Sequence, residues 1–167
     1  YPAPAFYRRF QAPLALARRI YHSDPSLSLL RELVQPLLQE QLGHGLFHCK
    51  RVGIDSATLV YVELESSPME RDRLEHLMLL SLIAALLHDV CRDQEDHARA
   101  GALAAAQILA EFPLTEEEVE GICQAIGNHE AFSAPSRCRS STWQLISDCL
   151  YDADKFRWGP DNFSEML

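Results

Sequence analysis

The apolar residues of the chain recur every three or four positions, and the strict alternation that marks strands is scarce. This period is that of the α-helix. The pattern predicts an all-α single domain of about six to seven helices, with the main helices over residues 26–42, 47–65, 69–89, 97–112, 115–129 and 141–157. Residues 1–25 hold four prolines and many aromatic residues. We therefore expect an N-terminal arm with one short helix, followed by the domain in residues 26–167.

Residues that break or begin helices interrupt this pattern. Pro36 is expected to kink or divide the first long helix, because proline lacks the amide hydrogen and clashes with the preceding turn. Thr115 and Glu118 have the spacing of a capping box, which begins a helix. Gly101 lies in an alanine-rich helix, where its missing side chain permits a close approach to a neighbouring helix. The polar segment 91–96 is predicted to be a turn.

The apolar faces of four predicted helices each begin or end on a histidine or an aspartate. Continuing each face by three or four positions leads to these residues: His48 beside Val52 and Leu59, His88 and Asp89 after Leu82 and Ala85, His129 after Ile126, and Asp154 after Leu150. A buried carboxylate without a partner costs several kcal/mol, and a divalent metal ion would remove that cost. A single histidine on an apolar face is more often a hydrogen-bonded core residue. The spacing alone therefore leaves a core interpretation and a metal-site interpretation open.

Composition narrows the classes of partner. The chain has 167 residues, of which 47% are hydrophobic, so it can bury one core of its own. Its net charge is -9 and it has no long lysine or arginine cluster, so we expect no extended nucleic acid as a partner. A small phosphorylated substrate is compatible with this charge, because a metal ion and one or two basic side chains can outweigh it locally. No apolar run reaches the roughly 18 residues of a membrane span, so no membrane association is expected.

The cysteines indicate the compartment. They are five in number, and no two of them have the C-x-x-C spacing of a zinc ribbon or a thioredoxin motif. We expect reduced thiols in the core and a cytoplasmic location. The chain begins with tyrosine instead of methionine, so a multidomain parent chain is considered. A homo-oligomer is considered as well.

Four short segments resemble the motifs of one protein family: residues 48–52 resemble H-x-x-R-V, residues 84–90 resemble A-A-L-L-H-D-I, residues 97–102 resemble H-x-x-x-G-A, and residues 126–129 resemble a later helix that carries another ligand. Followed by Asp154, they stand in the order found in the HD-domain superfamily of metal-dependent phosphohydrolases. The resemblance covers roughly residues 40–158. It implies an HD-domain helical bundle. The residues implied to bind one divalent metal ion are His48, His88, Asp89 and Asp154.

In the binuclear branch of the family, two further histidines hold a second ion, with the aspartate of the pair as a bridge. His97 and His129 stand in those two places, and Asp89 in that of the bridge. An alternative for His97 is a helix-start residue capped by Asp93 or Asp96. The expected cofactor is Mn, Fe, Co, Ni or Zn, with one or two ions per chain.

Two departures limit what the resemblance implies. The Gly-Tyr-Pro signature of the cyclic-di-GMP branch is absent after His129, so that activity is not carried over. Residues 90–93 lack the family's common glycine-lysine pair, which leaves the substrate side of the pocket undefined.

Charged residues close to the implied ligands are candidates for the chemistry. The candidates for binding a substrate phosphate are three cations: Arg51, Arg92 and Lys155. The alternative for each is a solvated surface cation. Asp93 and Glu95, in the turn after the pair, are the candidates for a general acid or base. Asp55, two helical turns after His48, is predicted to orient that ligand.

The leading interpretation is a metal-dependent phosphohydrolase, meaning a phosphatase, nucleotidase or phosphodiesterase. It would hydrolyse a small phosphate ester or nucleotide through a metal-activated water. Two alternatives stay open. Some proteins of the HD fold are di-iron oxygenases that cleave carbon–carbon or carbon–phosphorus bonds, and six candidate ligands would permit such a centre. The other alternative is a non-catalytic metal-binding sensing or interaction domain, whose N-terminal aromatic residues could cover a partner or pack on the chain's own core.

Overall fold

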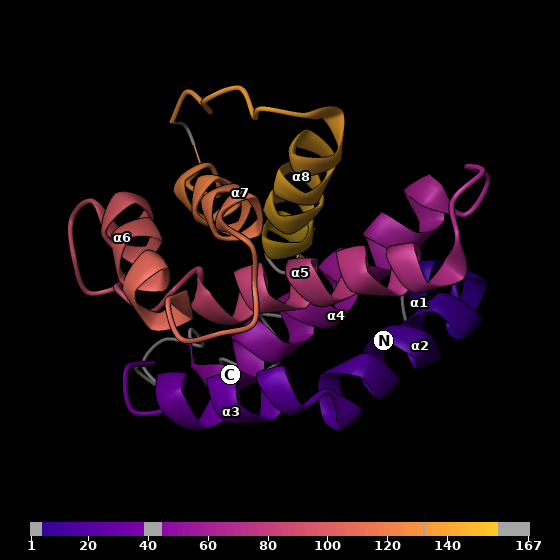
Figure 1. The fold of residues 1–167 in the computed structure, drawn as a ribbon, viewed down its shortest axis with the longest axis horizontal. Coiled ribbons are helices and arrows are strands. Elements are labelled where there is room, and N and C mark those ends of the chain that lie inside the picture. Colours follow the sequence, from indigo (N-terminus) through magenta and orange to yellow (C-terminus); the bar gives the residue numbers. More distant parts are fainter. Residues whose placement is uncertain (1–4, 39–44, 132, 157–167) are drawn as a thin grey trace.

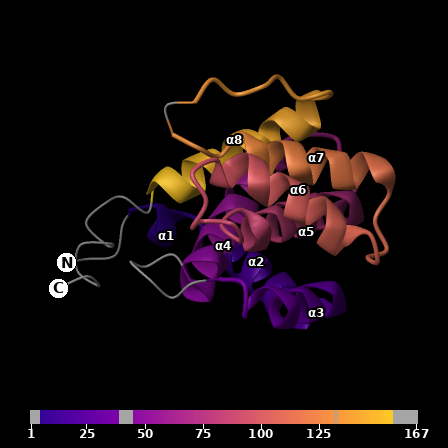
Figure 2. The same ribbon diagram turned by 90° about the vertical axis from the view of Figure 1, so that its left-hand side faces the viewer.

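The computed structural model describes residues 5–38, 45–131 and 133–156. Within these ranges it is all-helical and has no strand, so the predicted all-α class is confirmed. The helices are α1 (Ala5–Arg9), α2 (Gln11–Ser23), α3 (Pro25–Val34), α4 (Leu46–Leu64), α5 (Arg71–Leu87), α6 (His97–Leu109), α7 (Glu116–Gly127) and α8 (Ser141–Phe156). Figures 1 and 2 show α4 and α5 in the middle, with α2 and α3 on one side and α6, α7 and α8 on the other. None of the helices in the described ranges is both long and apolar enough to cross a membrane.

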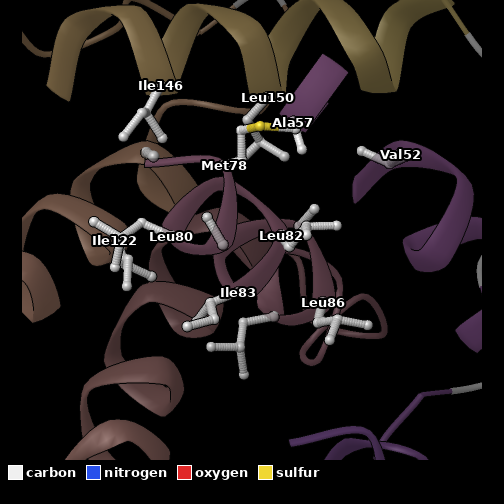
Figure 3. Close-up of a cluster of buried hydrophobic side chains, with 14 of the residues drawn as sticks. Val52, Ala57, Met78, Leu80, Leu82, Ile83, Leu86, Ile122, Ile146 and Leu150 are labelled. Atoms are coloured by element: carbon white, nitrogen blue, oxygen red, sulfur yellow. The ribbon is translucent and has the colours of Figure 1, made fainter. Parts of the chain in front are cut away.

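The helix α5 is the centre of the core. All residues from 80 to 87 are buried, and α5 packs against α2, α3, α4, α6, α7 and α8. Its side chains project in several directions toward α4, α7 and α8, as Leu82, Ile83 and Leu86 illustrate (Figure 3). The polar Ser81 is buried as well, and its hydroxyl forms a hydrogen bond of 2.7 Å with the Ser56 hydroxyl of α4. The sequence suggested one apolar face for this helix, whereas its second half, residues 80–87, is buried on all sides.

Identifiable residues set both ends of α3. α3 begins at Pro25, and the Asp24 side chain accepts hydrogen bonds from two amides of its first turn (2.9 and 3.2 Å). It ends at Val34, earlier than the predicted helix over 26–42, because Pro36 has no amide hydrogen to continue the ladder. The rest of that predicted helix falls outside the described residues beyond position 38.

The capping box at the start of α7 is confirmed. The Glu118 amide donates to the Thr115 hydroxyl at 3.3 Å, and the Thr115 amide donates to the Glu118 carboxylate at 2.8 Å. α7 ends at Gly127, two residues before the predicted end at position 129. The remaining predicted boundaries agree with the structure to within a few residues, as expected for helix ends.

Residues 5–23 form two helices instead of the arm with one short helix that the sequence suggested. The inward face of α2 is buried and comprises Leu14, Leu16, Ala17, Ile20 and Tyr21. Pro13 is compatible with this helix because it lies in the first turn, where no amide hydrogen is needed. Phe6 and Tyr7 of α1 contact the Phe156 ring, with centroids 5.9 and 6.3 Å apart. The described N-terminal aromatic residues thus pack on the chain's own core.

The end of α5 is tightly built. The helix stops at Leu87, and two backbone hydrogen bonds of the i to i+3 type (3.3 and 3.1 Å) lead the chain into a turn that holds His88 and Asp89. α6 packs closely beside this turn, because a Cβ atom on Gly101 would lie 3.3 Å from the carbonyl oxygen of His88. The close approach predicted at Gly101 is therefore confirmed, and it brings the start of α6 to the pair.

Candidate metal centre

Five helices bring the six predicted metal ligands into one buried cluster. The members are His48 in the first turn of α4, His88 and Asp89 after α5, His97 at the start of α6, His129 after α7, and Asp154 in the last turn of α8. Their exposed fractions range from 0% for His88 to 9% for His97. The side chains are thus held where water is largely excluded.

Asp89 lies between two groups of histidines. Its Oδ2 atom lies 3.4 Å from Nε2 of His88 and 3.7 Å from Nε2 of His48. Its Oδ1 atom lies 3.7 Å from Nε2 of His129. The ligand atoms of His48, His88 and Asp89 lie within 4.8 Å of one another, and so do those of Asp89, His97 and His129. Asp89 therefore belongs to two groups. The first group is His48, His88 and Asp89, and the second group is Asp89, His97 and His129.

Asp154 joins the first group from α8. Its Oδ1 atom lies 3.2 Å from Nε2 of His48 and 3.8 Å from Nε2 of His88, while its Oδ2 atom accepts a hydrogen bond of 2.7 Å from Lys155. Burial alone raises the pKa of Asp154, but the neighbouring His48 and the Lys155 ammonium outweigh burial and hold this pKa well below its ordinary value. Asp154 is therefore an anion at neutral pH.

Backbone hydrogen bonds orient two of the imidazoles. Nδ1 of His88 donates to the Ala85 carbonyl at 2.7 Å, and Nδ1 of His129 donates to the Ile126 carbonyl at 2.6 Å. A carbonyl oxygen only accepts, so Nδ1 carries the hydrogen in both rings and Nε2 of the neutral ring keeps a lone pair. Complete burial lowers the pKa of His88 to about 4 although Asp89 opposes the shift, so this ring is neutral at neutral pH.

This arrangement fits a divalent cation. The Nε2 atoms of His88 and His129 are buried and have no hydrogen-bond partner among the described residues. The lone pair of each nitrogen lies close to an oxygen of Asp89, and two lone pairs repel one another unless a cation lies between them. Neutral imidazole nitrogen and carboxylate oxygen suit Mn, Fe, Co, Ni or Zn. One divalent ion would also balance the two charges of Asp89 and Asp154.

The second group is bordered by Arg92 and Glu130. Nη1 of Arg92 lies 2.8 Å from Nε2 of His97 and 3.8 Å from Oδ1 of Asp89. Nδ1 of His97 lies 3.9 Å from a carboxylate oxygen of Glu130. Burial, His129 and Arg92 lower the pKa of His97, so this ring is also neutral at neutral pH. The second group thus has the cationic side chain of Arg92 in contact with two of its members.

The other candidate residues lie around the cluster. The Arg51 guanidinium stacks on the Phe47 ring, 5.4 Å from its centroid. Asp93 and Glu95 are exposed on the turn between α5 and α6, and neither side chain makes a hydrogen bond or ion pair with another described residue. The acid–base and phosphate-binding roles stay predictions. The alternative in which Asp96 caps His97 is wrong, because the Asp96 side chain makes no cap hydrogen bond.

Three contacts near the cluster were not predicted. The backbone amide of Asn128 caps α7, while its side chain accepts from the Ser136 amide at 2.9 Å and donates to the Ser147 hydroxyl at 3.1 Å. Glu130 faces His97, as described above. Asp55, predicted to orient His48, accepts a hydrogen bond of 2.9 Å from the Tyr7 hydroxyl. Neither Asn128 nor Glu130 continues an apolar face, so only their place beside His129 could have pointed to them.

Neither a protein-family model nor a curated protein matches the sequence significantly. The structure is similar to the crystal structure of a predicted HD superfamily hydrolase from an uncultured Thermotogales bacterium. The TM-score is 0.62 and the sequence identity 23%, and the match covers 85% of this chain and 74% of that chain. At this identity the similarity concerns the fold. The chain therefore has the HD-domain fold, as the sequence resemblance led us to expect.

Proposed function

We propose that the protein is a metal-dependent phosphohydrolase that hydrolyses a small phosphate ester or nucleotide. The observation that carries this proposal is the convergence of two buried imidazole nitrogens, Nε2 of His88 and of His129, on the buried carboxylate of Asp89. The fold shared with a predicted HD superfamily hydrolase supports the same class of activity. The proposed location is the cytoplasm, supported by five free cysteines.

The first group supplies the proposed ligands of the principal metal ion, Mn, Fe, Co, Ni or Zn. These ligands are His48, His88, Asp89 and Asp154. When bound, such an ion polarises a phosphoryl oxygen and lowers the pKa of a water molecule beside it. The backbone hydrogen bond at Nδ1 of His88 holds its Nε2 atom toward the carboxylates. Lys155 binds one oxygen of Asp154 and leaves the other toward His48.

Cations and acids at the border of the cluster are proposed to handle the substrate. Arg51 and Arg92 would bind phosphate oxygens, which the net charge of -9 would otherwise repel. Arg92 has a side chain that is 37% exposed, so it is accessible to a ligand in solution. Asp93 or Glu95 would transfer a proton to or from the leaving group, because both carboxylates lie on the turn beside the cluster.

The proposal is tested by metal content and phosphate release together. Protein purified without chelators should carry first-row metal by elemental analysis, and should release phosphate or nucleoside from a panel of phosphate esters and nucleotides. Asp89→Ala should lose metal and activity together and keep its helical circular dichroism. The exposed Asp152, on α8, provides a matched control, because Asp152→Ala should change neither.

Three other results would contradict the proposal. A phosphohydrolase would be refuted if metal-loaded protein releases no phosphate from any substrate and Asp89→Ala changes neither metal content nor phosphate release. Oxygen consumption by iron-loaded protein with a polyol or a phosphonate would instead favour the di-iron oxygenase. A folded protein that binds no metal would refute the metal site on which the proposal rests.

A further inference from the structure

Arg92 places a permanent positive charge inside the second histidine group. Its Nη1 atom lies 2.8 Å from Nε2 of His97 and 3.8 Å from Oδ1 of Asp89. Oδ1 is the Asp89 oxygen that faces His129, while Oδ2 faces the first group. The guanidinium therefore approaches the same oxygen and the same histidine that a second metal ion would need.

Hydrogen-bond chemistry shows that His97 is already engaged. A guanidinium has donors only and does not lose its charge in proteins. Nε2 of His97 must therefore be the acceptor, and its lone pair is taken by Arg92. The hydrogen of the neutral ring is then on Nδ1, which faces the Glu130 carboxylate at 3.9 Å. In this arrangement neither nitrogen of His97 offers a lone pair to a metal ion.

The charges of the two groups also argue against a second metal ion beside Arg92. The first group contains two carboxylates, Asp89 and Asp154, which one divalent ion balances. Among the described residues, the second group holds one carboxylate, the shared Asp89, together with two histidines. A second divalent ion there would sit beside the Arg92 guanidinium, and the carboxylate that faces His97 among the described residues is that of the more distant Glu130.

We infer that Arg92 occupies the place of the second metal ion, so that the resting protein binds one divalent ion tightly in the first group and takes a second only when Arg92 leaves. This inference rests on the proposed metal site. The Arg92 side chain can move away from His97 toward solvent, because it lies on the turn after α5 and is 37% exposed. The phosphate of a substrate is a ligand that would draw the guanidinium away from His97.

The test counts bound Mn²⁺ ions in the full chain without any activity measurement. Calorimetry and elemental analysis should give one tight equivalent for the wild type and two for Arg92→Ala, with the affinity of the second equivalent at least tenfold higher than in the wild type. Electron paramagnetic resonance gives an independent readout, since two neighbouring Mn²⁺ ions couple and a single ion does not. Arg92→Gln provides a second variant should Arg92→Ala fail to fold.

Two control variants make the result specific. Arg99→Ala removes one arginine from α6, where its side chain is 80% exposed, and should leave the count at one. The double variant Arg92→Ala with His97→Ala should return the count from two to one.

Each remaining outcome is decisive. Two tight equivalents in the wild type, or one in both Arg92 variants, would overturn the inference and leave the proposed function intact. No bound Mn²⁺ in any variant would overturn the proposed metal site itself.

Discussion

Oδ1 of Asp154 lies 3.2 Å from Nε2 of His48, and this contact joins the last described helix to the helix in which the cluster begins. The other oxygen, Oδ2, accepts a hydrogen bond from Lys155. The two oxygens thus have different neighbours, a cation on one side and imidazoles on the other. An amide at this position would present an N–H group to one of them and would carry no charge.

Asp154→Asn should therefore lower the affinity for the first metal ion by at least about 100-fold, because changing a group that merely orients a ligand already costs roughly 10- to 100-fold. Titration calorimetry with Mn²⁺ measures this. Asp152→Asn is the matched control, since Asp152 is exposed on the same helix and should bind metal like the wild type. Unchanged affinity in Asp154→Asn would remove this residue from the site.

The burial of His88 predicts a loss of stability in weak acid for the metal-free protein. The folded pKa of about 4 lies below the ordinary value of 6.5, so between these values the unfolded chain binds a proton that the folded chain does not. The free energy of unfolding should be highest above pH 6.5 and should fall by on the order of 3 kcal/mol toward pH 4. Urea unfolding at pH 7 and pH 5 tests this window.

A variant without the titrating ring checks the assignment. His88→Asn should show a smaller fall between pH 6.5 and 4, and an equal fall would show that other groups cause it. Asp154 acts in a separate window. Its pKa is held below the ordinary 3.8, so its contribution is present above that pH and is lost only as the pH falls further.

The indole of Trp143 covers Gly121, and a methyl group at that position would overlap the ring. Trp143 is only 5% exposed, and the atoms that a methyl group would meet belong to its rigid ring, so the whole indole would have to shift. Gly121→Ala should destabilise the protein by about 2–3 kcal/mol despite the better helix propensity of alanine. Thermal or urea unfolding measures the loss.

Gly127 provides the comparison on the same helix. A Cβ atom there would meet nothing within 4 Å, so Gly127→Ala should be neutral or should stabilise by up to about 1 kcal/mol. Similar losses for the two variants would mean that helix propensity, and not the Trp143 contact, decides the result.

The Asn128 carboxamide holds the loop after α7 with both of its atoms. Its oxygen accepts from the Ser136 amide at 2.9 Å, and its nitrogen donates to the Ser136 carbonyl at 2.9 Å. A carboxylate cannot donate, so Asn128→Asp should cost about 1–3 kcal/mol and should expose the loop to proteolysis. Gln124→Glu, a similar change at a less buried residue that contacts the same loop, should cost less than about 0.5 kcal/mol. Equal protease resistance of Asn128→Asp and the wild type would contradict this role.

The sequence predicted the cluster well where periodicity reaches it. His88, His129 and Asp154 each continue an apolar face, so helix geometry alone points them into the core. Arg92 is different, because it lies on a turn where no period fixes the direction of a side chain. Its contact with His97 therefore could not be anticipated, although the residue itself was among the candidates.

The N-terminal region shows a second limit. Its prolines suggested an irregular arm, yet Pro13 lies in the one part of a helix that tolerates it. Only the packing of α2 on α4 and α5 shows that these residues belong to the core. Tertiary burial decided the structure where local propensity suggested otherwise.

The position of α5 has a consequence for hydrogen exchange. The second half of α5, residues 80–87, is covered on every side, so a local opening does not expose its amides and they exchange with solvent only when the whole domain unfolds. When deuterated protein is transferred into ordinary water, the amides of residues 80–87 should hence retain deuterium longest. The histidine–aspartate pair follows directly on this slowest-opening segment, so the lifetime of its arrangement is tied to that of the native state as a whole.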